Sequence, residues 1–410
     1  MPHKKRGTMK VQKRILFFRF SVVIILFLSV NTHEKLIDST VSRLTANHSF
    51  SIFNYHVKYI PSQIWSLVTN LNSDRSHGVD TITNYFKNRE IRYKNIEEET
   101  KIYQNTNSQD YHKSSSMKNF LDEQRKLIEI KLNNLIKNEL INQNLGMFNS
   151  KFLFPPLFVN LDSPPYLLVV SPKDNIQIIS KILIIPSIKI SDIESLERLI
   201  EKETKTSVLI VNLGGIATYP PLISDKETLI FTMETISHEW FHHYWFFKPL
   251  GFNYFKSREM TILNETAAEI AGSEIGNLAY NQLKLKQSTN KSENLPKSGF
   301  IFNDEMRETR SRLDELLKQK LIDEAELYLA TRRLAFLEAG FNIRKLNQAY
   351  FAFYGTYGQN PASSSTIAVD LELLREKSKN LEEFILTVSG FGNYNDFLLH
   401  IKQIKSNYSK

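Results

Sequence analysis

The residues most able to perform chemistry lie in the run His238-Glu239-Trp240-Phe241-His242. Residues four apart lie on one face of an α-helix, so His238 and His242 can present two imidazoles to a single metal ion. Glu239 would then lie beside a water molecule on that ion. Zinc in a catalytic site takes three protein ligands and leaves a fourth position for water, whose pKa falls to about 7 on binding. The run therefore predicts a hydrolytic zinc site with Glu239 as the general base.

A third ligand must come from elsewhere, and the sequence limits its type. Beyond the adjacent His243, neither histidine nor aspartate occurs before Asp304, which leaves glutamate. The stretch 262–278 is rich in Ala and Ile and predicts a helix. The candidates on or near it are Glu259, Glu265, Glu269 and Glu274. Glu265 and Glu269 share a face, which allows Glu265 to ligate the metal while Glu269 accepts a hydrogen bond from the outer nitrogen of a ligand histidine.

This pattern resembles that of the gluzincin metallopeptidases, the thermolysin-like and aminopeptidase-like zinc enzymes, over about residues 205–280. Their H-E-x-x-H, followed on a downstream helix by N-E-x-x-x-D or a close variant, corresponds here to His238, Glu239, His242, Asn264, Glu265 and Glu269. The gap from His242 to Glu265 is a few residues longer than usual, and Glu269 stands where an aspartate is common. The resemblance implies one Zn²⁺ per chain on His238, His242 and Glu265. It also implies that Asn264 and Glu269 support these ligands.

An apolar, β-branched run at 207–213 precedes the zinc motif and is closed by two glycines, which predicts a strand entering a bulge or a close backbone approach. In gluzincins an edge strand in this position pairs with the substrate backbone. By that resemblance the substrate-binding residues are Gly214, Gly215, Ile216 and Ala217, which would act by strand addition. An ordinary buried strand and turn is the alternative.

Hydrolysis through a tetrahedral intermediate also needs a donor aimed at the developing oxyanion. Related enzymes use a histidine or a tyrosine from beyond the ligand helix, and His400 is the sole histidine there. The aromatic segment 350–358 therefore supplies Tyr354 and Tyr357 as candidates, with packing as the alternative role. His243 points about 100° away from its neighbour around the helix and is interpreted as structural.

Charge is unevenly distributed along the 410 residues. The formal net charge is +8, and the first 19 residues carry seven basic side chains and no acidic one. The basic pI therefore indicates a targeting segment and no nucleic-acid surface. Residues 1–13 are predicted to be a basic cytoplasmic tail, and 14–30 a transmembrane anchor or the core of a signal peptide. No A-x-A-like site follows, so a retained single-pass anchor is favoured, with secretion after signal cleavage as the alternative.

The absence of cysteine excludes disulfides and thiolate zinc ligands. Residues 31–150 are polar and predict a helical stalk or pre-domain. A zincin-like catalytic lobe is expected over 151–290, and a helical C-terminal lobe over 291–410. The expected strands are 166–170, 176–185 and 208–213, and they form a small twisted sheet. The expected helices are 117–144, 226–247, 304–337, 367–380 and 394–404, with a polar linker at 287–299. The predicted fold class is therefore α+β, zincin-like, after an N-terminal membrane anchor.

These features predict a membrane-anchored, extracytoplasmic zinc metallopeptidase that acts on peptide or protein substrates. A bacterial origin is inferred because Asn264-Glu265-Thr266 would be a glycosylation sequon inside the active site in a eukaryotic secretory pathway. The alternative is a non-catalytic, membrane-anchored binding or scaffold protein of zincin fold. The intact Glu239 and ligand set favour the enzyme, and a zinc hydrolase of non-peptide amides or esters would need the same residues.

Overall fold

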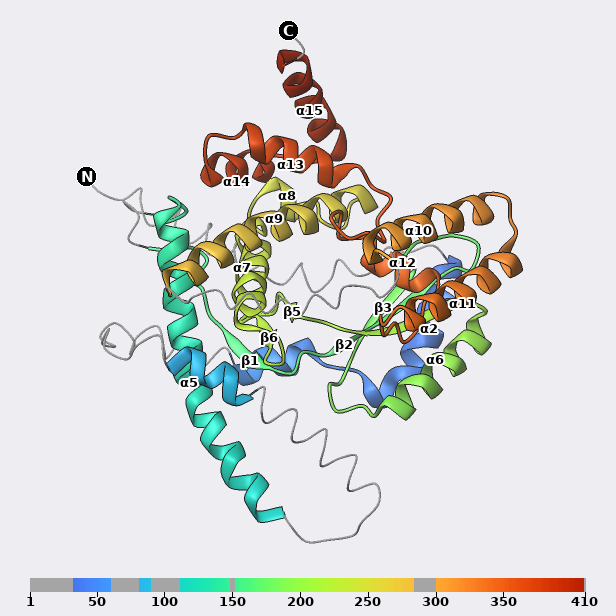
Figure 1. The fold of residues 1–410 in the computed structure, drawn as a ribbon, viewed down its shortest axis with the longest axis horizontal. Helices are drawn as coiled ribbons and strands as arrows, with labels where there is room; N and C mark the ends of the chain where they lie inside the picture. The colour runs from blue at the N-terminus through green and yellow to red at the C-terminus, as the bar shows by residue number, and fades with distance from the viewer. Residues whose placement is uncertain (1–31, 60–80, 90–110, 148–151, 284–299, 409–410) are drawn as a thin grey trace, which may run out of the picture.

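The computed structural model describes residues 32–59, 81–89, 111–147, 152–283 and 300–408, and combines many helices with two small sheets (Figure 1). The predicted α+β class is confirmed at this level. One sheet is antiparallel, in the order β3-β2-β4, with β2 at Tyr166–Ser171, β3 at Ser180–Ile184 and β4 at Ser207–Asn212. The strand expected over 176–185 thus begins later, because Ile176 packs instead among helices of the C-terminal half.

Different helices cover the two faces of this sheet. Leu168 and Ile210 pack against α2 (Thr32–Thr45) and α6 (Ile190–Thr204). The 3-10 helix η1 (Ala46–His48) follows α2. Val169 and Leu209 point to the opposite face and pack against α12 (Gln348–Tyr354). Because successive side chains of a strand alternate between faces, burial of both faces explains why β2 and β4 are almost continuously apolar.

The second sheet joins segments on either side of the glycine pair. Its order is β1-β6-β5, with β1 (Asn160–Asp162) parallel and β5 (Gly215–Ile216) antiparallel to β6 (Leu222–Ser224). β5 is therefore an edge strand, and among the described residues no strand pairs with its outer side.

Two helices form the centre of the fold, α7 (Leu229–Trp245) and α9 (Arg258–Gln282), joined through the short α8 (Pro249–Phe252). Thr228 accepts a hydrogen bond from Phe231 N and so caps α7, and Ser257 caps α9 in the same way. The aromatic side chains of Trp240, Phe241 and Trp245 on α7 are fully buried in the core.

Two glycines let α7 and α9 cross with their backbones in contact. A Cβ at Gly272 would lie 2.8 Å from the backbone nitrogen of His238. A Cβ at Gly276 would lie 2.6 Å from the Cα of Glu234. Interiors are close-packed, so α9 approaches this closely only where it has no side chain. The crossing therefore lies at the turn of α7 that carries the first predicted ligand.

α5 (Tyr111–Asn142) packs into the same core. Its fully buried residues recur every four positions, as expected for the apolar face of a helix, and are Ile128, Leu132, Ile136 and Leu140. This part of the predicted stalk or pre-domain thus shares one apolar cluster with α7 and α9.

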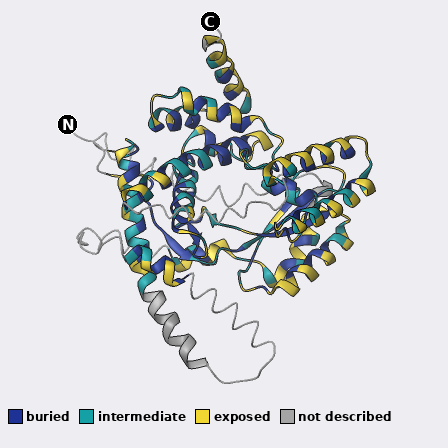
Figure 2. Ribbon diagram, viewed as in Figure 1, coloured by how far each residue is buried: buried dark blue, intermediate teal, exposed yellow. Residues whose placement is uncertain are grey.

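The helix expected over 304–337 is divided into α10 (Phe302–Lys318) and α11 (Ile322–Glu338). Lys320 separates them with a φ of 61°, a left-handed conformation that a helix cannot contain. These two helices form a cluster with α12, and their exposed residues lie on the outer side (Figure 2).

The last three helices, α13 (Ile367–Lys377), α14 (Leu381–Ser389) and α15 (Tyr394–Tyr408), contribute to the core of α7 and α9 instead. The predicted tail and anchor, residues 1–13 and 14–30, lie outside the described residues, as does the linker 287–299. Within the described part of the chain, no helix has the length and apolar character needed to cross a membrane.

Gly272→Ala is expected to destabilise the protein, because the added methyl group meets the backbone of α7. Overpacking of this kind costs about 1–3 kcal/mol, more than the gain in helix propensity. The measurement is the urea concentration at half-unfolding. Gly392→Ala is the control, since its nearest neighbours would lie at 3.7 and 3.8 Å, an ordinary contact. Equal midpoints for the two variants would contradict the close crossing.

Candidate metal centre and active site

Three side chains from two helices converge on one point. The Nε2 atoms of His238 and His242, on α7, lie 3.0 Å apart. Glu265 Oε2, from α9, lies 3.4 Å from the first nitrogen and 3.5 Å from the second. Among the described residues this is the one His/Cys/Asp/Glu group whose ligand atoms are close enough together to hold a metal ion.

The separations suit a small divalent cation. Tetrahedral ligands about 2.0–2.2 Å from zinc are separated from one another by roughly 3.3–3.6 Å. The two nitrogen–oxygen distances, 3.4 and 3.5 Å, fall in this range, and the two nitrogens, 3.0 Å apart, are slightly closer. Two imidazole nitrogens and one carboxylate oxygen are also a donor set that catalytic zinc sites use with a position left open. The three residues therefore fit zinc in both number and type.

Asn264 fixes the orientation of one ligand. Its Oδ1 lies 2.9 Å from His242 Nδ1. Because an amide oxygen only accepts, Nδ1 carries the hydrogen and the lone pair of Nε2 is free for a metal. Asn264 is almost completely buried, so this hydrogen bond has little competition from water.

Tyr254 fixes the third ligand and was not predicted from the sequence. Its hydroxyl donates a hydrogen bond to Glu265 Oε1, which leaves Oε2 directed at the imidazoles. Thr261 Oγ1 donates to the carbonyl of Tyr254 at 2.8 Å and holds this loop over the first turn of α9. No sequence motif marks Tyr254, because the contact depends on how the α8–α9 loop folds back.

Burial and charge act in opposite directions on the ligands. Burial alone would raise the pKa of Glu265, but the two imidazoles hold it well below its usual range. Burial alone would lower the pKa of His242, whereas the Glu265 carboxylate raises it to about 9. The raised pKa favours the protonated imidazole in the absence of a metal, so a metal ion would compete with a proton for Nε2.

Glu239 lies where α7 faces the edge strand. A Cβ at Gly215 would lie 2.8 Å from Glu239 Oε1 and 2.7 Å from Thr235 Cγ2. Glycine at 215 thus allows the strand to approach the carboxylate directly. Burial raises the pKa of Glu239 above its usual value, against the opposing effect of the two imidazoles. A raised pKa makes a carboxylate a more effective general base near neutral pH, because its pKa is then closer to the working pH.

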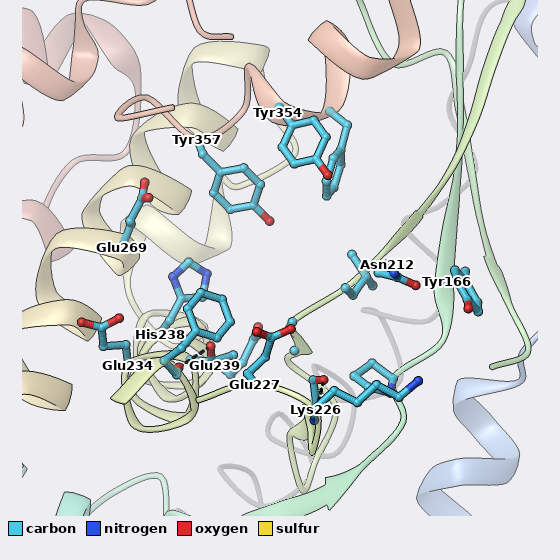
Figure 3. A pocket seen from close by; sticks show the side chains of 18 of the residues that line it. Tyr166, Asn212, Lys226, Glu227, Glu234, His238, Glu239, Glu269, Tyr354 and Tyr357 are labelled. Atoms are coloured by element: carbon cyan, nitrogen blue, oxygen red, sulfur yellow. Dashed lines mark hydrogen bonds between the residues drawn. The ribbon is translucent and has the colours of Figure 1, made fainter. Parts of the chain in front are cut away.

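A cavity of about 540 Å³ opens beside these residues. Gly214 and Gly215 line it on the strand side. Figure 3 shows Tyr357 above His238, and Asn212 of β4 across the cavity from both. The acidic, basic and histidine side chains along its wall are Lys226, Glu227, Glu234, His238, Glu239 and Glu269.

Glu269 lines this cavity but makes no hydrogen bond to either ligand histidine in the described structure. Its Oε2 is buried without a hydrogen-bond partner. Burial raises the pKa of Glu269 to about 7, with nearby His238 acting in the opposite direction. The hydrogen bond expected between Glu269 and a ligand histidine is thus not seen. Instead, Asn264 accepts a hydrogen bond from the outer nitrogen of His242.

Both predicted oxyanion donors line the cavity. The ring centre of Tyr357 lies 6.5 Å from that of His238. Gly358 N donates to Thr266 Oγ1 at 2.9 Å, which ties the Tyr357 segment to the residue after Glu265. Burial raises the pKa of Tyr354 and that of Tyr357, so both phenols stay protonated and can donate.

No model of a protein family matches this chain, and comparisons with curated proteins and with solved structures give no match either. Inference about function therefore depends on the geometry of the site itself.

Tyr254→Phe is expected to weaken zinc binding, because Glu265 loses the donor that holds its outer oxygen. Loss of such a supporting contact lowers metal affinity by about 10- to 100-fold. Competition with a chromogenic chelator measures the change. Tyr244→Phe, whose ring stacks on Trp240, is the matched control and should bind zinc as the unmodified chain does. The same affinity in both variants would show that Tyr254 does not support the ligand.

Glu269→Gln is expected to change how stability depends on pH in the metal-free protein. The unfolded carboxyl loses its proton near pH 4.5, while the folded one keeps it to about pH 7. Between these values the folded state binds more protons, so the stability of the unmodified protein falls as pH rises. The variant has no such carboxyl and does not lose this stability. The melting temperature of the variant minus that of the unmodified protein should therefore increase from pH 4.5 to 7 and then stay constant. Parallel melting profiles would contradict the assignment.

Proposed function

We propose that this chain is a zinc-dependent metallopeptidase. The proposal depends on one observation. The ligand atoms of His238, His242 and Glu265 are as close to one another as the ligands of a single metal ion, and they lie beside a buried Glu239 at the wall of a cavity. A metal site that served only structure would be closed by protein ligands, whereas three ligands next to a cavity leave room for a substrate.

When bound at these ligands, zinc would polarise the scissile carbonyl and lower the pKa of the attacking water. Glu239 accepts the proton of that water and passes it to the leaving amine. Tyr357, with Tyr354 as the second candidate, donates a hydrogen bond to the carbonyl oxygen as negative charge develops there. The raised pKa of the phenol supports this role, because the group remains a donor throughout the working pH range.

The substrate is proposed to bind as an added strand on β5. The side of β5 that faces away from β6, within the segment 214–217, has no strand partner among the described residues, and Gly214 and Gly215 line the cavity. Main-chain hydrogen bonds would hold an extended peptide here with little demand on side-chain type. A peptide or protein substrate suits this mode better than a small ester, which offers no backbone to pair.

The alternative of a non-catalytic scaffold gives no reason for Glu239 to be buried beside the ligands. A buried carboxylate is costly unless it is paired or used. We further propose that residues 14–30 anchor the chain in the membrane. Residues 1–13 would then lie in the cytoplasm, and the zinc site on the extracytoplasmic side of the membrane. This part of the proposal rests on the sequence alone.

Glu239→Gln is the test of the chemistry. The variant should bind zinc as the unmodified chain does, because residue 239 is not a ligand, yet lose at least about 10²- to 10⁴-fold in peptide hydrolysis. Zinc content is measured by elemental analysis, and hydrolysis by mass spectrometry of a synthetic peptide mixture. Glu227→Gln, another acid of the same cavity, is the control and should keep its activity. Undiminished turnover in Glu239→Gln would refute the proposed mechanism.

A further inference from the structure

We propose that His243 is a positioning residue that fixes the edge strand β5 to α7 and so aligns a paired substrate with Glu239. The inference rests on the proposed function, because it concerns how the substrate backbone is held. It assigns a role to a histidine that is not one of the three ligands.

The chain from Gly214 to Ala217 follows one row of side chains on α7. A Cβ at Gly214 would lie 3.1 Å from the Phe231 ring. One at Gly215 would meet both Thr235 and Glu239. Farther along, the carbonyl of Ala217 lies 3.2 Å from His243 Nε2. Rows at a spacing of four residues form slanted ridges on a helix, and the contacted residues form such a row: Phe231, Thr235, Glu239 and His243.

The two ends of this row hold the strand by different means. At Gly214 and Gly215 the strand lies so close to α7 that an added Cβ would meet its side chains, but no hydrogen bond between these glycines and α7 is found in the described structure. Close packing resists approach but does not prevent the strand from lifting off. At Ala217 the contact is directional, because a carbonyl oxygen accepts and the Nε2–H of His243 must donate. The ring of His243 also packs edge-on against Tyr219, with centres 5.4 Å apart.

The backbone turns away directly after Ala217. Thr218 N donates to Ile216 O at 2.7 Å, and Tyr219 N donates to His56 Nε2 at 3.1 Å. The edge that a substrate can pair with therefore ends at the residue held by His243. Since Glu239 lies one turn before His243 on the same helix, this hydrogen bond fixes the distance between the paired backbone and the general base.

His243→Leu tests the proposal, with His243→Gln as the rescue variant, because a glutamine amide can donate from a similar position. In His243→Leu we expect KM for the best-cleaved synthetic peptide to rise about 5- to 10-fold, the effect of one lost neutral hydrogen bond, with zinc content unchanged. kcat should fall less than kcat/KM. His243→Gln should recover most of the loss, and His400→Leu, on α15, should behave as the unmodified chain.

Amide hydrogen exchange supplies a second readout that needs no activity. The segment 214–219 should exchange faster in His243→Leu than in the unmodified chain, and His243→Gln should restore its protection, while the α7 amides stay unchanged. Unchanged exchange in this segment, or equal KM in all variants, overturns the role of His243. If the unmodified chain hydrolyses no peptide, the proposed function fails and substrate alignment fails with it. The exchange data then still decide whether His243 holds the strand.

Discussion

The close contact between the backbones of α7 and α9 is the constraint on which the site depends. Gly272 lies against His238 and Gly276 against Glu234, so the two helices cross without intervening side chains. Glu265 is on α9 and two turns before Gly272, and only a crossing this close brings its short carboxylate to the imidazoles of α7. A side chain at either glycine would meet the backbone of α7 at less than 3 Å, so the two helices would have to move apart to accommodate it.

Two hydrogen bonds orient two of the candidate ligands in the same way. Asn264 accepts a hydrogen bond from the outer nitrogen of His242, and Tyr254 donates one to the outer oxygen of Glu265, so these two residues each have one atom satisfied and one atom directed inward. Protein contacts thereby fix the orientation of these two candidate ligands before any metal binds. Glu269 differs, because one of its oxygens is buried without a partner and its pKa is raised by that burial.

α7 combines three functions on different sides of one helix. One side carries Trp240 and Trp245 into the core, and their indole N–H groups donate to Pro155 O and Ser389 Oγ. A second side presents the two candidate metal ligands, His238 and His242. A third side follows β5 through Thr235, Glu239 and His243. Because the core contacts hold the helix rigidly on the first side, the relation between ligands, base and strand is set by helix geometry.

The sequence by itself determined whatever depends on spacing within one element. The helical period places His238 and His242 on one face with Glu239 beside them, and apolar runs locate most of β2 and β4. The helical period does not decide between contacts made by residues far apart in the chain. The sequence pattern singled out Glu265 among four candidate glutamates, and the structure places it beside the two histidines. Only the tertiary structure decided that Tyr254 and not Glu269 bonds to a ligand, and that His243 reaches Ala217. The physical reason is that these contacts depend on how closely α9, the α8–α9 loop and β5 pack on α7. That closeness is set by the fit of whole surfaces and by glycines at the points of contact. The sequence alone does not show which glycines have a neighbouring element against them.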